Sequence, residues 1–237
     1  MKNYITPLLV TPLAAAVLLA CSSAPSTAAQ PASQENAQVS AQTPAASPAL
    51  PLQSAAPVNP FPGAAPLPAG ADTAIFAGGC FWCVESDFEK LTGVYEVISG
   101  YTGGDLQSPT YRNHGQHVEG AKVIFDPNVI SYDQLLEFYW PHVDPTDNGG
   151  QFCDRGNAYI PVIYARPDQT AQAAASKAAI EESKPFADPI VVPILPAKTF
   201  WEAEDYHQDY YKKKPRRYKF YRNGCGRDKR LQSLWGP

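Results

Sequence analysis

Apolar residues between positions 73 and 212 follow two spacings, one typical of strands and one typical of helices. Short apolar runs predict strands at 73–77, 94–99, 118–125, 159–165 and 190–195. Helical spacing predicts a helix from Cys80 toward Gly93, one capped by Ser131, one over 167–183 and one over 200–212. Strands and helices mix without strict alternation. We therefore expect an α+β fold with one mixed sheet and helices packed on it, a two-layer, ferredoxin-like sandwich.

The first 20 residues have a different pattern, with a lysine near the start, an apolar stretch and small residues at the end. This order predicts a secretory signal peptide. The stretch is short for a membrane span and is interrupted by Pro7 and Pro12. It ends in Leu18-Leu19-Ala20-Cys21, which resembles the bacterial lipobox, so we predict that Cys21 is lipidated. The alternative is ordinary cleavage that leaves Cys21 as a stray thiol.

Residues 21–71 are rich in alanine, proline and serine, and Glu35 is their only charged residue after the signal. Such a segment cannot bury enough apolar surface to offset its conformational entropy, so we predict a disordered, lipid-anchored linker. The remaining chain is long enough for one domain with a core of its own. We predict a catalytic domain over 72–215 and a basic C-terminal tail over 216–237.

Charge adds little about partners, because the formal net charge of −4 gives no reason to expect nucleic acid. The basic residues are concentrated near the C-terminus, which predicts a solvated tail. A second interpretation is that Arg222 and Arg227 flank Cys225 and lower its pKa.

Cys80 follows Gly78 and Gly79, between the end of a predicted strand and the start of a predicted helix. Backbone amides at a helix N-terminus carry partial positive charge, and glycine allows close approach of the backbone to a substrate. Both features are expected to stabilise a thiolate, so Cys80 is predicted to be a reactive nucleophile. A domain of this size does not need structural disulfides, so the other cysteines are candidates for redox chemistry.

Cys80 and Cys83 form a C-x-x-C pattern that has three interpretations. It is typical of a dithiol that transfers disulfides, of half a zinc site completed here by His114 and His117, or of a nucleophile with an incidental neighbour. The pattern alone does not choose among them.

Several ordered motifs resemble those of the peptide methionine sulfoxide reductases of type A, over roughly residues 73–215. They are Gly78-Gly-Cys-Phe-Trp82, Gly100-Tyr-Thr-Gly-Gly104, Ser108-Pro-Thr-Tyr111, His117-Val-Glu119-Gly, Tyr132-Asp-Gln-Leu-Leu, Asp144-Pro-Thr, Asp154-Arg-Gly-Asn-Ala-Tyr159 and Ala203-Glu-Asp-Tyr-His-Gln-Asp-Tyr210. This ordered set is far more specific than the C-x-x-C pattern.

The resemblance implies a role for each matching residue. Cys80 is expected to attack the sulfoxide sulfur, and Glu119 is expected to be a protonated carboxyl that gives its proton to the departing oxygen. Tyr111 and Tyr159 are expected to donate hydrogen bonds to that oxygen. Phe81 and Trp82 are expected to contact the S-methyl group, and Asp154 is expected to bind the substrate backbone. Without the resemblance, Glu119 would be predicted to face solvent and the tyrosines to serve packing.

Recycling of Cys80 is expected to require a second thiol, which condenses with the sulfenic acid, and a thioredoxin-like dithiol that reduces the resulting disulfide. We rank Cys225 first as the second thiol, then Cys83, then Cys153. The resemblance implies no bound cofactor, metal, nucleotide or flavin, and a preference for the S epimer.

We expect a monomer that acts on methionine sulfoxide in envelope proteins, or on the free amino acid as well. Its expected location is the periplasmic side of a membrane, with the outer membrane favoured because Ser22 follows the lipidated cysteine. A periplasmic thiol-disulfide oxidoreductase and a zinc-binding module are the alternatives.

Overall fold

The computed structural model describes residues 67–236. The predicted signal peptide, the lipidation site Cys21 and the predicted linker up to residue 66 lie outside the described residues. Between residues 67 and 236, no helix combines the length and the apolar character that crossing a bilayer requires.

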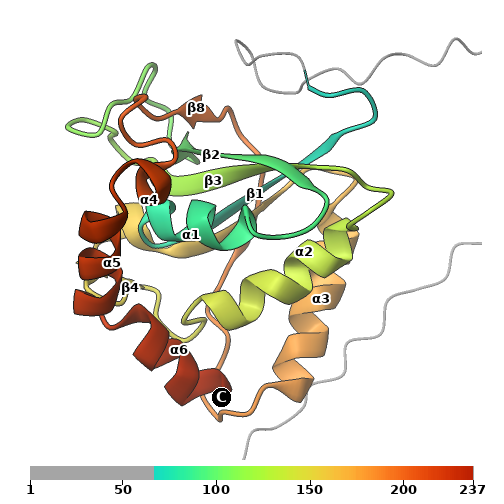
Figure 1. Cartoon of the computed structure of the whole chain (residues 1–237). Coiled ribbons are helices and arrows are strands. Elements are labelled where there is room, and N and C mark those ends of the chain that lie inside the picture. Colours follow the sequence, from blue (N-terminus) through green and yellow to red (C-terminus); the bar gives the residue numbers. More distant parts are fainter. Residues whose placement is uncertain (1–66, 237) are drawn as a thin grey trace, which may run out of the picture. The chain divides into compact units, whose positions relative to one another are not determined.

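The centre of the fold is a six-stranded sheet with the strand order β7-β6-β1-β3-β2-β8 (Figure 1). Its strands are β1 Asp72–Gly78, β2 Val94–Thr102, β3 Val118–Phe125, β6 Pro161–Ala165, β7 Ile194–Pro196 and β8 Trp201–Glu202. The four inner strands pair antiparallel, and β7 adds to β6 in parallel. In chain order the inner strands read fourth, first, third, second, which is the predicted ferredoxin-like arrangement.

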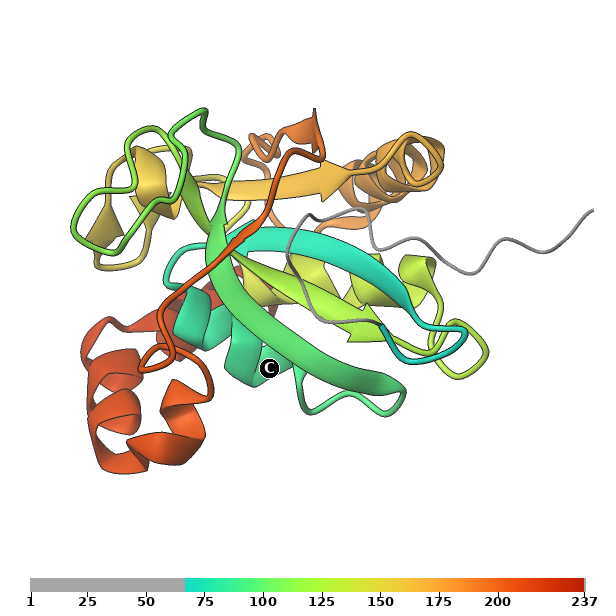
Figure 2. The same ribbon diagram turned by 90° about the horizontal axis from the view of Figure 1, so that it is seen from above.

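Helices cover one face of this sheet and continue around one end of it (Figures 1 and 2). They are α1 Phe81–Phe88, α2 Tyr132–Tyr139, α3 Thr170–Ser183, α4 Tyr210–Lys213, α5 Pro215–Gly224 and α6 Arg227–Trp235, with 3-10 turns η1 Trp140–His142 and η2 Asn157–Tyr159. A short hairpin joins β4 Gly150–Gln151 to β5 Asp154–Arg155. The main core lies between the sheet and helices α1, α2 and α3. The prediction of an α+β sandwich is confirmed.

The start of α2 follows its sequence signature. The Ser131 side chain accepts a hydrogen bond from the Gln134 backbone, and the Gln134 side chain accepts one from the Ser131 backbone. This capping box satisfies two amides that a helix otherwise leaves open. Leu135 and Leu136 then point into the core and are fully buried.

The helix predicted over 200–212 is wrong. Trp201 and Glu202 instead pair with β2 opposite Tyr101 and Gly100. A side chain at Gly100 would lie 2.3 Å from the Trp201 carbonyl, so only glycine allows this close pairing. Turns follow, and α4 begins after Asp209, whose left-handed backbone with φ 53° interrupts any continuous helix.

The predicted solvated C-terminal tail is also wrong. Its residues form most of α5 and all of α6. Tyr218, Leu231 and Leu234 are buried, and the Arg227 side chain is buried with them. The apolar residues between the charges, which charge patterning obscures, pack these helices on the domain.

Truncation of Leu135 tests the core between the sheet and α2. Because its side chain is fully buried, Leu135→Ala is expected to lower the free energy of unfolding by about 2–5 kcal/mol. Leu106→Ala, at a position that is 37% exposed, is the matched control and is expected to change it by about 0.5 kcal/mol or less. Urea denaturation of both variants measures the difference, and equal effects would contradict the placement of Leu135.

Candidate active site

Cys80 lies at the turn between β1 and α1, as predicted, and is the N-cap residue of the helix. Gly79 adopts φ 85°, and a Cβ at this position would lie 2.7 Å from the Gln151 side chain. The backbone can therefore bend here, and Gln151 can pack directly against the turn. This brings the loop that follows η1 up to the nucleophile.

A small cavity of about 50 Å³ lies above Cys80. Its lining residues are Cys80, Phe81, Trp82, Tyr111, Glu119, Asp154, Tyr159 and Tyr221. The structure thus brings together every predicted catalytic and substrate-contacting residue, from segments up to 79 positions apart (Cys80 to Tyr159). Tyr221 is the one lining residue that the sequence analysis missed.

Glu119 faces this cavity from β3, with only 1% of its surface exposed. One carboxyl oxygen accepts a hydrogen bond of 3.1 Å from the Phe81 amide at the start of α1. Burial raises the pKa of Glu119 to about 8, so at neutral pH the carboxyl is mostly protonated. The alternative of a solvent-facing glutamate is wrong.

Tyr111 lines the cavity from a turn after β2, and Tyr159 lines it from the end of η2. Burial raises the pKa of both phenols, with Glu119 as a further cause, so both keep their protons. Tyr111 is still 42% exposed, so the cavity has an open side there. Two phenol donors and one neutral acid therefore face the same small space.

Aromatic rings hold Trp82 in place at the rim. Its indole stacks on Tyr210 at 3.8 Å between ring centroids and donates a hydrogen bond of 3.0 Å to His207 Nδ1. Burial lowers the pKa of His207, which keeps that nitrogen free to accept. His207 lies in a turn and not on the predicted helix, and its hydrogen bond orients the Trp82 ring. The signal for this role was its place within the Ala203–Tyr210 motif.

The Cys80 and Cys83 thiols are both buried in one cluster, and each shifts the pKa of the other. Burial raises the pKa of Cys80, and Cys83 and Glu119 raise it further. Burial therefore opposes the effect that was expected of the helix N-terminus, and it favours the protonated thiol. The neighbouring Cys80 thiol lowers the pKa of Cys83, and the charges of Arg227 and Arg222 add to this effect.

Arg222 and Arg227 do not lower the pKa of Cys225, as the second interpretation of the basic tail had proposed, because their partners lie elsewhere. Arg227 donates to the carbonyls of Gly78 and His142, and Arg222 forms an ion pair of 2.8 Å with Asp87. Arg227 thus lies against the Cys80 turn and Arg222 against α1, and the charges of both lower the pKa of Cys83.

Cys153 and Cys225 form a disulfide, so this domain contains a bridge that the sequence analysis considered unnecessary. The Tyr221 hydroxyl, one helical turn before Cys225, donates to the Asp154 carboxylate, and it lines the same cavity as Cys80, where it lowers the pKa of that thiol. Burial raises the pKa of Asp154, and the hydrogen bond from Tyr221 opposes this. The C-terminal helices therefore form one wall of the cavity.

The zinc-site alternative is not supported within the described part of the chain. His117 uses both ring nitrogens in contacts with Gly104 and Leu106, and His114 stacks on Tyr101. Between residues 67 and 236, the one close group of three potential ligands is Cys153, Asp154 and Cys225, and its two sulfurs are bonded to each other.

A buried thiol that faces a protonated carboxyl and two phenols defines a thiol-dependent oxidoreductase site. Residues 72–237 match the family model of peptide methionine sulfoxide reductase. Peptide methionine sulfoxide reductase MsrA 2 of Rhizobium meliloti is 50% identical over 165 residues, which cover 69% of this chain and 83% of the relative. The MsrA of Bacillus licheniformis is 49% identical over 170 residues, 70% of this chain and 94% of the relative.

Solved structures agree with these relatives. Reduced Mxr1 from Saccharomyces cerevisiae has a TM-score of 0.59 at 27% identity and covers 63% of this chain and 88% of its own. Methionine sulfoxide reductase A of Corynebacterium diphtheriae has a TM-score of 0.56 at 31% identity, with coverage of 62% and 76%. The chain belongs to the peptide methionine sulfoxide reductase family and is an oxidoreductase that reduces methionine sulfoxide.

Glu119→Gln tests the protonation of the buried carboxyl. The folded-state pKa of about 8 lies above the ordinary 4.5, so stability is fully present below about pH 4.5 and is lost as pH rises through 8. Glutamine stays neutral and still accepts from the Phe81 amide. From pH 5 to 8 the wild type is therefore expected to lose stability relative to the variant, by about 1.4 kcal/mol for each unit of pKa shift. Urea denaturation at several pH values measures this, and parallel curves would refute it.

Proposed function

We propose that this reductase acts on the S epimer of methionine sulfoxide, with Cys80 as the nucleophile and Glu119 as the proton donor. The observation that carries the proposal is the shared cavity, in which the Cys80 sulfur and the neutral Glu119 carboxyl face one small space. Peptide-bound methionine sulfoxide is the proposed main substrate, and the free amino acid is a smaller version of the same group.

The proposed first step forms a bond between Cys80 and the sulfoxide sulfur. The oxygen receives hydrogen bonds from Tyr111 and Tyr159 and a proton from Glu119, so that negative charge does not build up in a dry pocket. In the second step the substrate's sulfur–oxygen bond and the Cys80–sulfur bond both break, and a bond from the oxygen to Cys80 forms, which gives a sulfenic acid. The Cys80 thiol proton replaces the one that Glu119 gave. The substrate sulfur gains two electrons and leaves as methionine, and Cys80 loses two.

The aromatic rings are proposed to select the methyl group. Phe81 is buried beside Cys80, and Trp82 is held by Tyr210 and His207. Aromatic faces contact sulfur and its methyl group favourably. The Asp154 carboxylate, which lines the same cavity, is proposed to accept a hydrogen bond from a backbone amide of the bound peptide.

We propose Cys83 as the thiol that condenses with the sulfenic acid, ahead of Cys225. The Cys83 thiol already contacts Cys80, and the two arginines favour its thiolate form. Cys225, by contrast, is bonded to Cys153. Condensation of Cys83 with the sulfenic acid yields a Cys80–Cys83 disulfide and water, and a thioredoxin-like dithiol is proposed to reduce it.

Cysteine variants separate these steps. Cys80→Ser is expected to abolish reduction of a methionine sulfoxide peptide. Cys83→Ser is expected to release one equivalent of methionine and then stop, with a sulfenic acid at Cys80 that dimedone labels. Mass spectrometry of the wild type after one equivalent of peptide is expected to find a Cys80–Cys83 disulfide.

Other results would overturn the proposed order. Full turnover by Cys83→Ser with a thioredoxin would assign recycling to Cys225 or Cys153. Loss of even the first equivalent in Cys83→Ser would favour the thiol-disulfide oxidoreductase, which uses both cysteines at once.

A lipid-anchored location in the cell envelope is proposed from the first 21 residues, with the outer membrane favoured over the inner. Two features support it. A disulfide between Cys153 and Cys225 suits an oxidising compartment, and Met1 is the only methionine in the chain, so cleavage would leave none to be oxidised. The substrates would then be oxidised envelope proteins.

Cys21→Ala tests the anchor. The wild-type full chain, expressed in a bacterium that processes lipoproteins, is expected to fractionate with membranes and to carry acyl mass on an N-terminal Cys21. The variant is expected to leave the membrane fraction, because it has no acceptor for the lipid. An unacylated wild type in the periplasmic fraction would contradict the proposal.

A further inference from the structure

Two segments of the chain meet at one wall of the cavity, the hairpin of β4 and β5 and the C-terminal helix α5. Cys153 lies in the hairpin immediately before Asp154, and Cys225 follows the end of α5. Their Cα atoms are 4.8 Å apart and the sulfurs are bonded. The bridge therefore joins the two segments next to residues that line the cavity.

A hydrogen bond joins the same two segments a few ångströms away. The Tyr221 hydroxyl donates to the Asp154 carboxylate, and the Cys225 amide donates to the Tyr221 carbonyl at 2.9 Å. Two links therefore join the hairpin to α5. One is the disulfide between Cys153 and Cys225, and the other is the hydrogen bond between Asp154 and Tyr221. Because both links join neighbouring residues, the disulfide restricts where the Tyr221 hydroxyl can lie.

The disulfide itself does not open into the catalytic cavity. Cys80, Asp154 and Tyr221 line that cavity, whereas Cys225 lines a separate hollow with Phe152 and Arg230. The sulfurs of the bridge therefore do not line the substrate space, although Cys153 Sγ lies 3.7 Å from Asp154 Oδ1.

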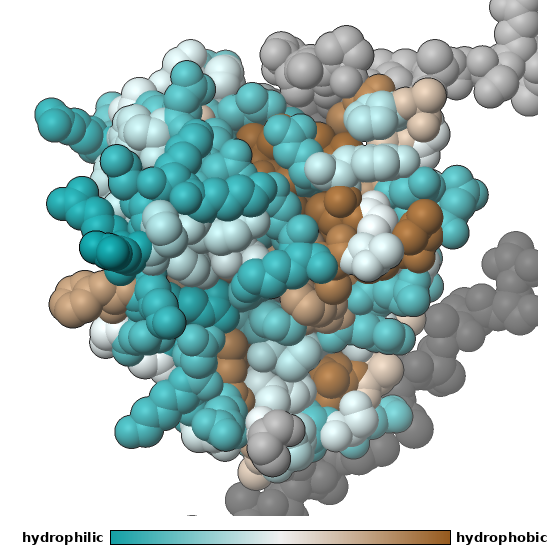
Figure 3. Space-filling view, in the orientation of Figure 1, coloured by the Kyte–Doolittle hydropathy of each residue, from teal (hydrophilic) through white to brown (hydrophobic). Residues whose placement is uncertain are grey.

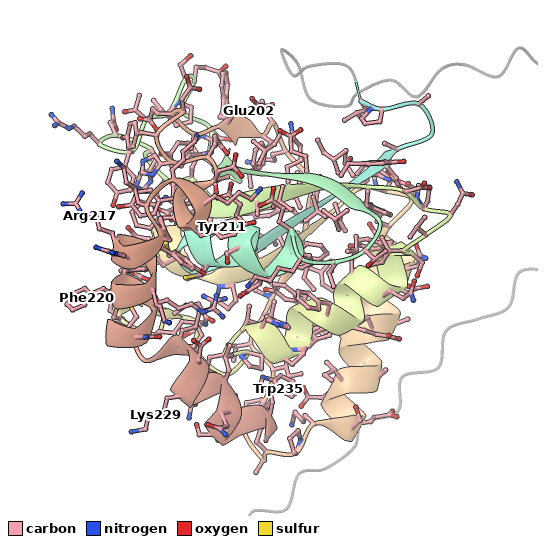
Figure 4. The ribbon with its side chains drawn as sticks, viewed as in Figure 1. Glu202, Tyr211, Arg217, Phe220, Lys229 and Trp235 are labelled. Carbon is pink, nitrogen blue, oxygen red and sulfur yellow. A yellow bond between two sulfur atoms is a disulfide. The ribbon has the colours of Figure 1, made fainter. Side chains whose placement is uncertain are left out.

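Besides the disulfide and the Tyr221–Asp154 hydrogen bond, helix α5 is attached by the buried Tyr218 and by the ion pair of 2.8 Å between Arg222 and Asp87. Of its ten residues only Tyr218 is buried, and Phe220 is 83% exposed. Figure 4 shows Arg217, Phe220 and, on α6, Lys229 pointing away from the domain, and the surface over these helices is mostly hydrophilic in Figure 3. A helix this short is marginal without tertiary contacts, so its position depends on tethers.

We propose that the Cys153–Cys225 disulfide is a positioning bridge for sulfoxide reduction, which holds the Tyr221 hydroxyl between the Cys80 sulfur and the Asp154 carboxylate. The bridge stays intact through the reaction, and only Cys80 and Cys83 change oxidation state. Tyr221 gives its hydrogen bond to Asp154 while Cys80 is a thiol, and to the Cys80 sulfur once that sulfur is a thiolate.

The proposal rests on Cys80 as the nucleophile. If α5 shifts by about 1 Å, the hydroxyl no longer reaches both partners at hydrogen-bond distance. Loss of the bridge is therefore expected to act on the first chemical step, through Tyr221, and not on recycling.

Single-turnover kinetics with a short acetylated methionine sulfoxide peptide test this in the full chain. Tyr221→Phe and the double variant Cys153→Ser/Cys225→Ser are each expected to slow formation of the first equivalent of methionine about tenfold, the size of one hydrogen bond to a charged group. The triple variant is expected to be no slower than Tyr221→Phe alone, because both changes remove the same contact.

Leu234→Ala is the matched control for general loosening of the C-terminal helices. Leu234 is buried in α6 and does not line the cavity. It is expected to lower the melting temperature as the double cysteine variant does, with an unchanged first-turnover rate. Thermal melting also confirms that each variant is folded.

Alkylation of Cys80 by iodoacetamide gives a readout independent of turnover. In a Cys83→Ser background, loss of the Tyr221 hydrogen bond is expected to move the alkylation midpoint to higher pH. Tyr221→Phe and Cys153→Ser/Cys225→Ser are expected to move it equally, and Leu234→Ala not at all.

Three results would overturn the positioning bridge. They are a wild-type first-turnover rate in Cys153→Ser/Cys225→Ser, a triple variant in which the two effects multiply, or an alkylation midpoint that moves only with Tyr221→Phe. None of these results changes the assignment of Cys80 as the nucleophile. That assignment fails only if Cys80→Ser still reduces the peptide.

Discussion

Exclusion of water from one small cavity governs this active site. Burial holds the Glu119 carboxyl and the phenols of Tyr111 and Tyr159 in their protonated forms, so three donors face the place where a sulfoxide oxygen would lie. The same burial raises the pKa of the Cys80 thiol. Burial thus keeps the groups that line this cavity in their neutral forms.

The C-terminal helices belong to this site as much as the sheet does. Arg222 and Arg227 bring positive charge near Cys83, and Tyr221 closes the wall next to Asp154. Arg227 also stacks on the Phe152 ring, which connects α6 to the hairpin that carries Asp154. The basic C-terminal segment therefore lowers the pKa of Cys83 through the positions of its arginines. The disulfide between Cys225 and Cys153 joins this segment to the hairpin that carries Asp154.

Sequence patterns predicted most of the elements because their causes are local. The capping box at Ser131, the apolar run of β3 and the Gly78-Gly79 turn before α1 each reflect neighbouring residues. The helix predicted over 200–212 failed because β2 competes for Trp201 and Glu202, and that pairing depends on Gly100, a hundred residues earlier. The helix propensity of residues 200–212 was overridden by the pairing with β2, which a local stretch of sequence cannot show.

The cavity residues could be named only through motifs that resemble a family, since nothing local marks Glu119 as buried or Tyr159 as a donor. By itself, the sequence determined where the reactive turn lies, which elements surround it and which residue types are available. The tertiary structure decided which thiol lies against which charge, that Cys225 pairs with Cys153, and that Tyr221 enters the site. Those outcomes depend on burial and on distances between segments far apart in the chain, because water exclusion and charge act through space.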